Sequence, residues 1–168
     1  MKILDSYDIA IVGSGPGGFS AAVRAAQFGA KVVIIEKSFI GGTCLNCGCI
    51  PTKFLWQALK TKQIVQKSYE YGFKATLCPI VFSDIIEKKK KNVSNIKNGM
   101  KMVLSSYGID IVKGSASFKT KNILIVSDDE KNIILELYAA KIIVASGTSP
   151  SVIENFVFDG NKIISSTD

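Results

Sequence analysis

The 168-residue chain alternates between short apolar runs and longer stretches of mixed polarity. Residues 7–12 and 31–36 are short runs rich in valine and isoleucine, which is typical of parallel strands buried on both faces. The alanine-rich stretch 19–28 between them has the composition of a helix, and Gly29 suits the position just after its end. The pattern therefore predicts a strand–helix–strand unit at the start of the chain.

Two longer amphipathic helices are predicted next. The first covers residues 54–71, and we interpret its apolar stripe as part of the core. The second begins with Ser83 as its N-cap and ends at Gly108. Between them, Cys78 precedes Pro79 in a loop, where we expect a free and partly buried thiol. The expected apolar faces comprise Phe54, Leu55, Ala58, Leu59, Val65 and Tyr69 in the first helix, and Ile86, Val93, Ile96, Met100 and Val103 in the second.

The last third of the chain predicts strands. Residues 109–112 resemble a third parallel strand, and three short segments separated by polar turns suit an antiparallel β-meander. Residues 142–145 then return to the main sheet. The fold class that follows is α/β, a doubly wound parallel sheet with a glycine-rich βαβ unit and an antiparallel β-meander. The three meander segments lie around residues 117–118, 123–126 and 133–137.

Composition is that of an ordinary globular domain, with 47% hydrophobic and 21% charged residues. No apolar run approaches the roughly 18 residues of a membrane span, and the N-terminus lacks the apolar stretch of a signal peptide. We therefore expect one domain, no membrane partner and a reducing, cytoplasmic setting, in which paired cysteines are more often catalytic than architectural.

The formal net charge of +7 invites a nucleic-acid interpretation, which the details disfavour. Among the 21 basic residues only Arg24 is arginine, so the forked donor suited to phosphates and base edges is nearly absent. The densest lysine run, residues 88–91, lies in a predicted helix without interleaved aromatic residues. We interpret it as a solvated helix face and expect no nucleic-acid partner.

A glycine-rich segment follows the first predicted strand. In this context Gly13 permits a tight turn, Gly15 lets the backbone approach a pyrophosphate, and Gly18 lets the helix lie close to the strand. The helix N-terminus would hold the phosphates. Glu36 ends the second strand, where an acidic residue accepts hydrogen bonds from ribose hydroxyls; the alternative is an ordinary surface carboxylate. These features predict a dinucleotide site without distinguishing FAD from NAD.

Two cysteines, Cys44 and Cys49, lie five positions apart. Pro51 is tolerated in the first turn of a helix, so Cys49 should lie at or near a helix start, where a thiolate is favoured. Two thiols on one turn can close a disulfide, which favours a redox-active dithiol. The alternatives are a metal site that also uses Cys47 and Cys78, whose spacing departs from paired zinc knuckles, and a structural disulfide, which is less expected in this setting; we predict no metal.

The segment from Gly41 to Lys53, Gly-Gly-Thr-Cys-Leu-Asn-Cys-Gly-Cys-Ile-Pro-Thr-Lys, resembles the active-site motif of the flavin-dependent pyridine nucleotide-disulfide oxidoreductases. Within that family it is most similar to the dihydrolipoamide dehydrogenase type. The glycine loop, the acidic strand end and the dithiol follow in the family's order, and the resemblance covers the whole chain. Cys47 departs from the motif, and we interpret it as an inert small residue or as a thiol that competes with the pair.

The resemblance implies a role for each matching residue. Cys44 would be the interchange thiol that meets the substrate, Cys49 the thiol against the flavin, and Lys53 the cation beside the isoalloxazine ring; the alternative for Lys53 is a solvated lysine. Thr43 would cap the helix or touch the cofactor, and Gly114 would meet the adenine or simply turn the chain after a strand. The implied FAD contacts are Gly13, Gly15, Gly18, Glu36, Lys37, Gly42, Thr43, Lys53, Gly114, Ser146 and Gly147.

The resemblance also implies what the complete enzyme would need. We expect residues 1–168 to form an incomplete N-terminal FAD-binding domain, inactive alone, with the NAD-binding and dimerisation domains absent. The complete enzyme would be a homodimer that uses FAD and NAD and accepts dihydrolipoyl groups on acyltransferase or carrier proteins. The chain has no histidine, and in the family the acid–base histidine comes from the other subunit. Alternatives are a reductase of the glutathione or mercuric ion type, or a non-catalytic flavin- or metal-binding module.

Overall fold

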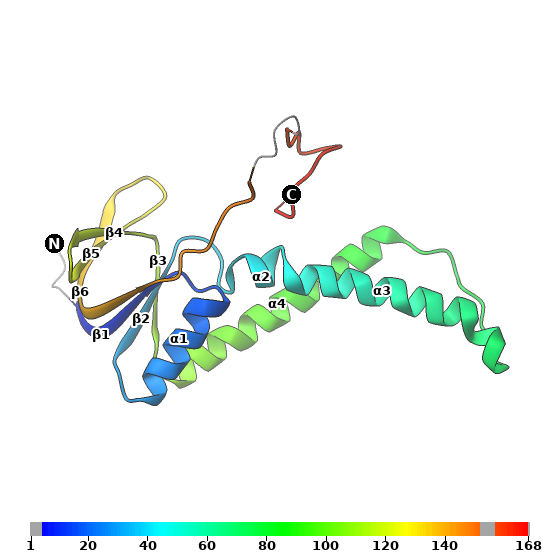
Figure 1. Cartoon of the computed structure of the whole chain (residues 1–168), viewed down its shortest axis with the longest axis horizontal. Coiled ribbons are helices and arrows are strands. Elements are labelled where there is room, and N and C mark those ends of the chain that lie inside the picture. The colour runs from blue at the N-terminus through cyan, green and yellow to red at the C-terminus, as the bar shows by residue number, and fades with distance from the viewer. Residues whose placement is uncertain (1–4, 152–156, 168) are drawn as a thin grey trace.

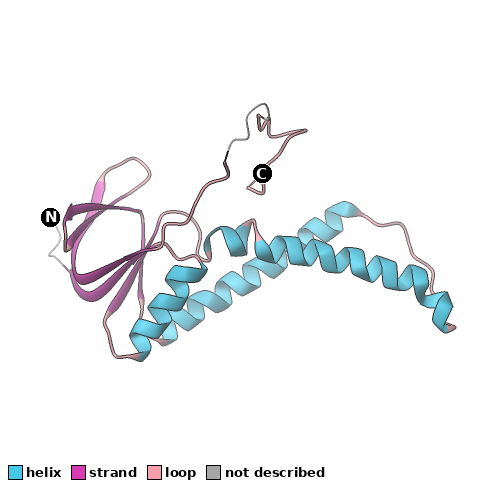
Figure 2. Ribbon diagram, in the orientation of Figure 1, coloured by secondary structure: helices cyan, strands magenta, loops and turns pink. Residues whose placement is uncertain are grey.

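A computed structural model describes residues 5–151 and 157–167 of the chain. A strongly curved sheet lies at one end, and two long helices extend away from it as an arm (Figure 1). Helices and strands are segregated in space, with the helices beside the sheet and beyond it (Figure 2). The predicted α/β fold class is confirmed.

The six strands form one sheet in the order β3-β2-β1-β6-β5-β4. The four strands β3, β2, β1 and β6 are parallel, whereas β5 and β4 add to β6 as an antiparallel meander. Crossover connections, here α1 and α4, are what parallel neighbours require. The strands are β1 (Asp5–Val12), β2 (Val32–Glu36), β3 (Asp110–Lys113), β4 (Ser115–Thr120), β5 (Ile123–Ser127) and β6 (Ile133–Val144). The helices are α1 (Pro16–Gln27), α2 (Gly42–Asn46), α3 (Cys49–Lys67), the 3-10 turn η1 (Ser68–Tyr71) and α4 (Phe82–Ser106).

Two apolar clusters cover the two faces of the parallel strands. Successive side chains of a strand point to opposite faces, so Ile11 and Ala10 of β1 belong to different clusters. On one side, Ile11 packs with Ala22 of α1 and Leu104 of α4. On the other side, Ala10 packs with Leu124 of the meander. The central strands β1 and β2 are thus buried between helices and antiparallel strands, as their uninterrupted apolar runs predicted.

Strand β6 differs from the prediction. Residues 133–137 and 142–145 were expected as two strands, but β6 runs without interruption from Ile133 to Val144. Its first half pairs with β5, and from Leu137 onward it pairs with β1. No glycine, proline or turn sequence lies between the two segments, so nothing in the chain ends the strand.

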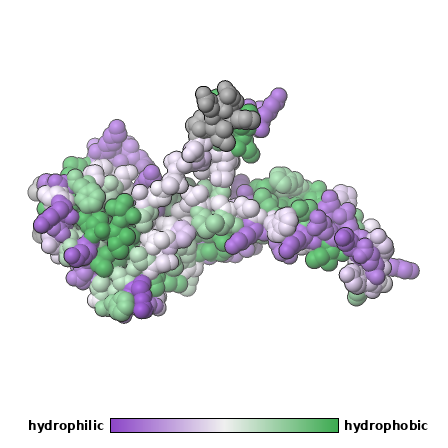
Figure 3. Space-filling view, viewed as in Figure 1, coloured by the Kyte–Doolittle hydropathy of each residue, from purple (hydrophilic) through white to green (hydrophobic). Residues whose placement is uncertain are grey.

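The apolar stripe of α3 is not core, contrary to the prediction. Leu59 is 44% exposed and Tyr69 in the following turn is 72% exposed. The reason is that α3 extends beyond the sheet and packs chiefly on α4, so α3 has one neighbouring long helix rather than a surrounding core. Figure 3 shows apolar surface along this arm. In the described part of the chain, no helix combines the length and apolarity that a membrane crossing requires.

Three details of the arm also correct the prediction. Helix α4 begins at Phe82 with Val81 at its N-cap, and the Ser83 side chain makes no capping hydrogen bond. Its most buried residue is Leu104, at 0% exposure, which the predicted apolar face missed. Cys78 is a free thiol in the loop, as expected, but it is exposed rather than partly buried.

The close contact between α1 and the turn before it generates a stability prediction. A Cβ atom added at Gly18 would collide with the carbonyl oxygen of Gly13, whereas one added at Gly17 meets nothing within 4 Å. Backbone cannot yield as a side chain does, so Gly18→Ala should lower the free energy of unfolding by about 1–3 kcal/mol. Gly17→Ala in the same helix should be neutral or stabilise by up to about 1 kcal/mol. Urea unfolding followed by circular dichroism measures both; equal effects would contradict the packing role of Gly18.

Candidate functional site

The carboxyl ends of β1, β2 and β6 meet at one edge of the sheet, and the glycine loop lies there. Gly13 has φ +101° and its N–H donates to the Ile35 carbonyl at 2.8 Å. A Cβ atom at Gly13 would collide with the Ala145 carbonyl oxygen, so the segment that contains Ser146 passes directly beside the turn. The structure therefore brings the predicted residues Gly13 and Ser146 together, although they are distant in the sequence.

Helix α1 presents an open N-terminus at this edge. Its N-cap is Gly15, no side chain caps it, and its first turn holds no acidic residue. A Cβ atom at Gly15 would meet nothing within 4 Å, so the space above the turn is open. Unpaired N–H groups and the positive end of the helix dipole make such a position suited to an anion.

Glu36 is buried at this edge, with 9% exposure. Its Oε2 accepts hydrogen bonds from the Ser14 N–H at 2.8 Å and the Ser14 hydroxyl at 2.6 Å, and its Oε1 accepts one from the Ser38 N–H at 2.8 Å. The alternative of an ordinary surface carboxylate is therefore wrong. A carboxylate has about four acceptor positions, so capacity remains for a ligand hydroxyl.

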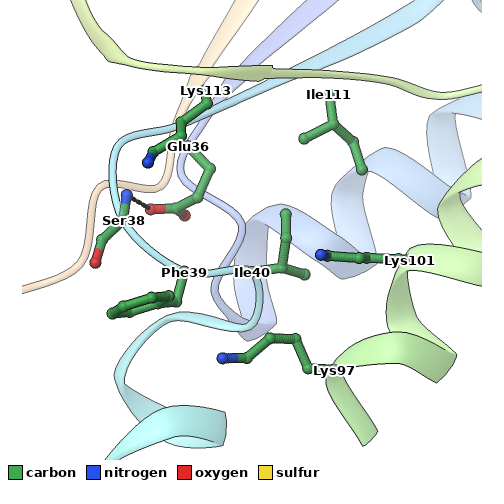
Figure 4. Close-up of a pocket in the computed structure, with 8 residues that line it drawn as sticks. All are labelled: Glu36, Ser38, Phe39, Ile40, Lys97, Lys101, Ile111 and Lys113. Atoms are coloured by element: carbon green, nitrogen blue, oxygen red, sulfur yellow. Dashed lines mark hydrogen bonds between the residues drawn. The ribbon is translucent and has the colours of Figure 1, made fainter. Parts of the chain in front are cut away.

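A pocket of about 200 Å³ lies beside Glu36 (Figure 4). Lys97 and Lys101 reach it from α4 and Lys113 from β3, and the Lys97 ammonium lies 4.7 Å from the centre of the Phe39 ring. These lysines belong to no motif that was recognised in the sequence. Lys97 and Lys101 are one helical turn apart, which places them on one face, but nothing local indicated that this face meets the sheet edge.

The two thiols lie on successive helices. Cys44 belongs to α2 and Cys49 is the first residue of α3, so the prediction that Cys49 starts a helix is confirmed. The helical conformation is interrupted between α2 and α3, and Gly48 is the N-cap of α3. A Cβ atom at Gly48 would lie 3.0 Å from the Thr43 carbonyl oxygen. The expectation that both thiols share one helical turn is wrong, because this break separates them.

The thiols interact directly, and both are free. A hydrogen bond to the Cys49 thiol is the main cause that raises the pKa of Cys44, followed by burial and by repulsion from Cys49, while the Cys49 backbone N–H and then Lys53 act in the opposite direction. Cys49 is exposed and Cys44 is partly buried. The arrangement suits a pair in which Cys44 keeps its proton and donates to Cys49, while Lys53 supplies a nearby positive charge.

Two polar side chains for which no role was predicted stabilise the dithiol segment through hydrogen bonds. The Asn46 amide donates to the carbonyls of Ile40 at 3.0 Å and Gly42 at 2.8 Å, and the Thr52 hydroxyl donates to the Gly48 carbonyl at 2.8 Å. Their only sequence signal was their place within the cysteine motif. Asn46 thus fixes the loop before α2, and Thr52 fixes the backbone at Gly48, just before α3.

Of three other residues predicted to contact FAD, Gly42 packs against the glycine loop, whereas Thr43 and Lys37 are exposed. A Cβ atom at Gly42 would lie 2.9 Å from the Gly15 Cα, so the dithiol segment packs on the glycine loop. Thr43 is exposed and caps neither helix, because the N-caps are Gly41 and Gly48. Lys37 is exposed as well.

Gly114 has φ +153° between β3 and β4, and a Cβ atom there would lie 2.5 Å from a Val126 methyl group. This contact requires glycine whether or not a ligand binds, in agreement with the strand-end alternative. Gly147 has φ +72° and open space around it, and Ser146 is exposed beside it. Both are accessible at the edge where the glycine loop lies.

Cys47 lies between the two helices and is partly buried. Its N–H donates to the Thr43 carbonyl at 3.0 Å, which ends α2. Within the residues that the structure describes, no group of three histidine, cysteine or acidic side chains is placed to hold a metal ion.

A glycine turn on a parallel sheet, a buried acidic strand end and an adjoining dithiol together define an α/β oxidoreductase. Residues 7–168 match the family model described as pyridine nucleotide-disulphide oxidoreductase, and the chain belongs to that family. Among curated relatives, the dihydrolipoyl dehydrogenases of Geobacillus stearothermophilus and Staphylococcus aureus are each 40% identical to it, over 94% and 95% of this chain and 33% and 34% of their own lengths. That of Acholeplasma laidlawii is 38% identical over 87% of this chain and 42% of its own length. The chain thus spans roughly a third of the curated relatives that it matches.

The hydrogen bond between the thiols generates a prediction on pH dependence. Cys49→Ala removes the main cause that raises the pKa of Cys44 and also removes the repulsion, leaving burial and the opposing effects of the backbone N–H at position 49 and of Lys53. The pKa of Cys44 should therefore fall, and alkylation of this thiol should reach half its maximal rate at a lower pH. Iodoacetamide rates measured against pH by mass spectrometry, with the exposed Cys78 as internal standard, check this. An unchanged midpoint for Cys44 would contradict the direct interaction.

Proposed function

We propose that residues 1–168 form the FAD-binding and dithiol-bearing part of a dihydrolipoyl dehydrogenase. In the complete enzyme, a homodimer, two electrons pass from a protein-bound dihydrolipoyl group to the Cys44–Cys49 disulfide, then through FAD to NAD⁺. The observation that carries this proposal is the placement of two free thiols, Cys44 on α2 and Cys49 at the start of α3, on a segment that packs against the glycine loop.

The residues at the sheet edge fit FAD. The open N-terminus of α1 at Gly15 suits the pyrophosphate, and the spare acceptor capacity of the buried Glu36 suits the ribose hydroxyls. Lys53 lies close enough to influence Cys44, so its charge is also available to an adjoining isoalloxazine ring. When bound, FAD supplies the two-electron carrier between the dithiol and the nicotinamide.

The thiol chemistry follows from the roles of the two cysteines. A substrate thiolate attacks the Cys44 sulfur, the Cys44–Cys49 bond breaks, and Cys49 leaves as a thiolate at the N-terminus of α3, where the helix dipole stabilises it. The second substrate thiol, deprotonated, attacks the substrate sulfur of the mixed disulfide. Cys44 departs and is protonated, and the oxidised lipoyl disulfide is released. One of the two substrate protons remains on Cys44 and the other leaves the site.

The proton that leaves needs an acceptor, and this chain has no histidine to provide one. In the family that the cysteine motif resembles, a histidine of the second subunit has this role. We assign it the same source here, so that a productive site requires the homodimer. The dihydrolipoyl substrate, rather than glutathione or mercuric ion, is supported by the relatives, which are dihydrolipoyl dehydrogenases.

A chimera tests the proposal, with residues 1–168 replacing the matching part of the Geobacillus stearothermophilus enzyme. Two-electron reduction should produce a long-wavelength thiolate–flavin absorbance band together with dihydrolipoamide-dependent NAD⁺ reduction. Cys49→Ser should abolish the band while FAD stays bound, because the thiolate against the flavin is lost. Cys44→Ser should leave the Cys49 thiolate, and hence a persistent band, without turnover. Each substitution should reduce turnover at least about a thousandfold, since neither disulfide exchange nor electron transfer can be completed.

Cys78→Ser serves as the matched control, because this thiol is exposed in the loop before α4 and makes no contribution to the pair. Its spectrum and turnover should equal those of the unsubstituted chimera. If both dithiol variants retained the band, the assignment of the two cysteines would be refuted.

A further inference from the structure

Ser14 is a fully buried polar residue that the proposed function does not use. It is 0% exposed, and its backbone N–H and its hydroxyl both donate to the same oxygen, Oε2 of Glu36, at 2.8 and 2.6 Å. Hydrogen bonds from a buried hydroxyl to a carboxylate are short and strong. Ser14 therefore determines how the Glu36 side chain is oriented.

The same residue also holds the start of the dithiol segment. The Gly41 N–H lies between two acceptors of Ser14, 3.1 Å from its carbonyl oxygen and 3.3 Å from its hydroxyl oxygen. Gly41 adopts φ +93° as the N-cap of α2, the five-residue helix that contains Cys44. The hydroxyl of Ser14 thus connects the acidic end of β2 to the helix of the first thiol.

We infer that Ser14 is a positioning residue that couples ligand occupancy at Glu36 to the placement of Cys44 on α2. This inference rests on the proposed function, because the ligand at Glu36 is the ribose of a dinucleotide. A ribose hydroxyl that donates to Glu36 immobilises the carboxylate. The immobilised carboxylate holds the Ser14 hydroxyl, and the hydroxyl in turn holds the Gly41 N–H.

The consequence for the dithiol follows from the rigidity of this path. With Gly41 held, α2 fluctuates less and the Cys44 thiol spends more time hydrogen-bonded to Cys49. A nucleotide that occupies only the ribose site then changes the reactivity of a thiol that it does not touch. An alanine at position 14 fills the same space and keeps the backbone bonds, but it lacks the hydroxyl link.

ADP is the probe that separates this path from direct contact, because it contains the ribose and phosphates of the dinucleotide but no flavin. In the reduced 168-residue chain, saturating ADP should slow iodoacetamide alkylation of Cys44 about fivefold, the lower end of ordinary coupling between sites. In Ser14→Ala, at ADP concentrations that calorimetry shows to be saturating, the effect should fall below about twofold. Without nucleotide, the Gly41 amide of Ser14→Ala should exchange its hydrogen faster than that of the unsubstituted chain.

Ser38→Ala is the matched control, because Ser38 contacts Glu36 through its backbone N–H, which alanine retains. It should preserve the full ADP effect on Cys44. The outcomes separate the two proposals. If ADP binds to the unsubstituted chain and the Cys44 rate does not change, the coupling is refuted and the dinucleotide site stands. If ADP does not bind at all, the proposed function fails and this inference fails with it. A full ADP effect in Ser14→Ala would show that the path runs elsewhere.

Discussion

The approach of helix α1 to the turn that precedes it, with no side chain between them, is the constraint on which the rest of the site depends. Gly13 and Gly18 allow this approach, and it places the helix N-terminus over the carboxyl ends of the parallel strands. The segment that follows β6 then passes beside Gly13, and the dithiol segment packs on Gly15. Three parts of the chain that are distant in sequence therefore share one small region of backbone, in which a side chain added at Gly13, Gly18 or Gly42 would displace a neighbour.

The features that could be predicted from the sequence are those whose conformation depends on a few adjacent residues. The glycine turn, the buried strand that ends in Glu36, and the helix start at Cys49 each follow from a few adjacent residues whose conformational limits are known. The fold class followed as well, because crossover helices between apolar strands leave few alternatives. The resemblance to the family could also be seen in the sequence, because the cysteine motif is one contiguous segment from Gly41 to Lys53.

The parts that could not be predicted depend on partners that are distant in sequence. The stripe of α3 has the periodicity of a core helix, yet whether such a stripe is buried depends on what packs against it, and in this structure α3 is covered mainly by α4. Ser14 occupies a position that the G-x-G-x-x-G pattern leaves unspecified, and only the structure shows that its hydroxyl lies between Glu36 and Gly41. The break at Gly48 separates two cysteines whose spacing suggested a single turn.

The unbroken strand β6 has a consequence for the order in which the molecule assembles. Strand β1 precedes the other described elements in the chain, but it lies between β2 and β6, and β6 ends only at Val144. One edge of β1 therefore remains without its partner until nearly the whole described chain has been synthesised, and it exposes unpaired backbone groups during that time. Because β6 pairs with β1 on one side and with β5 of the meander on the other, late synthesis of this one segment joins the parallel and antiparallel parts of the sheet in a single step.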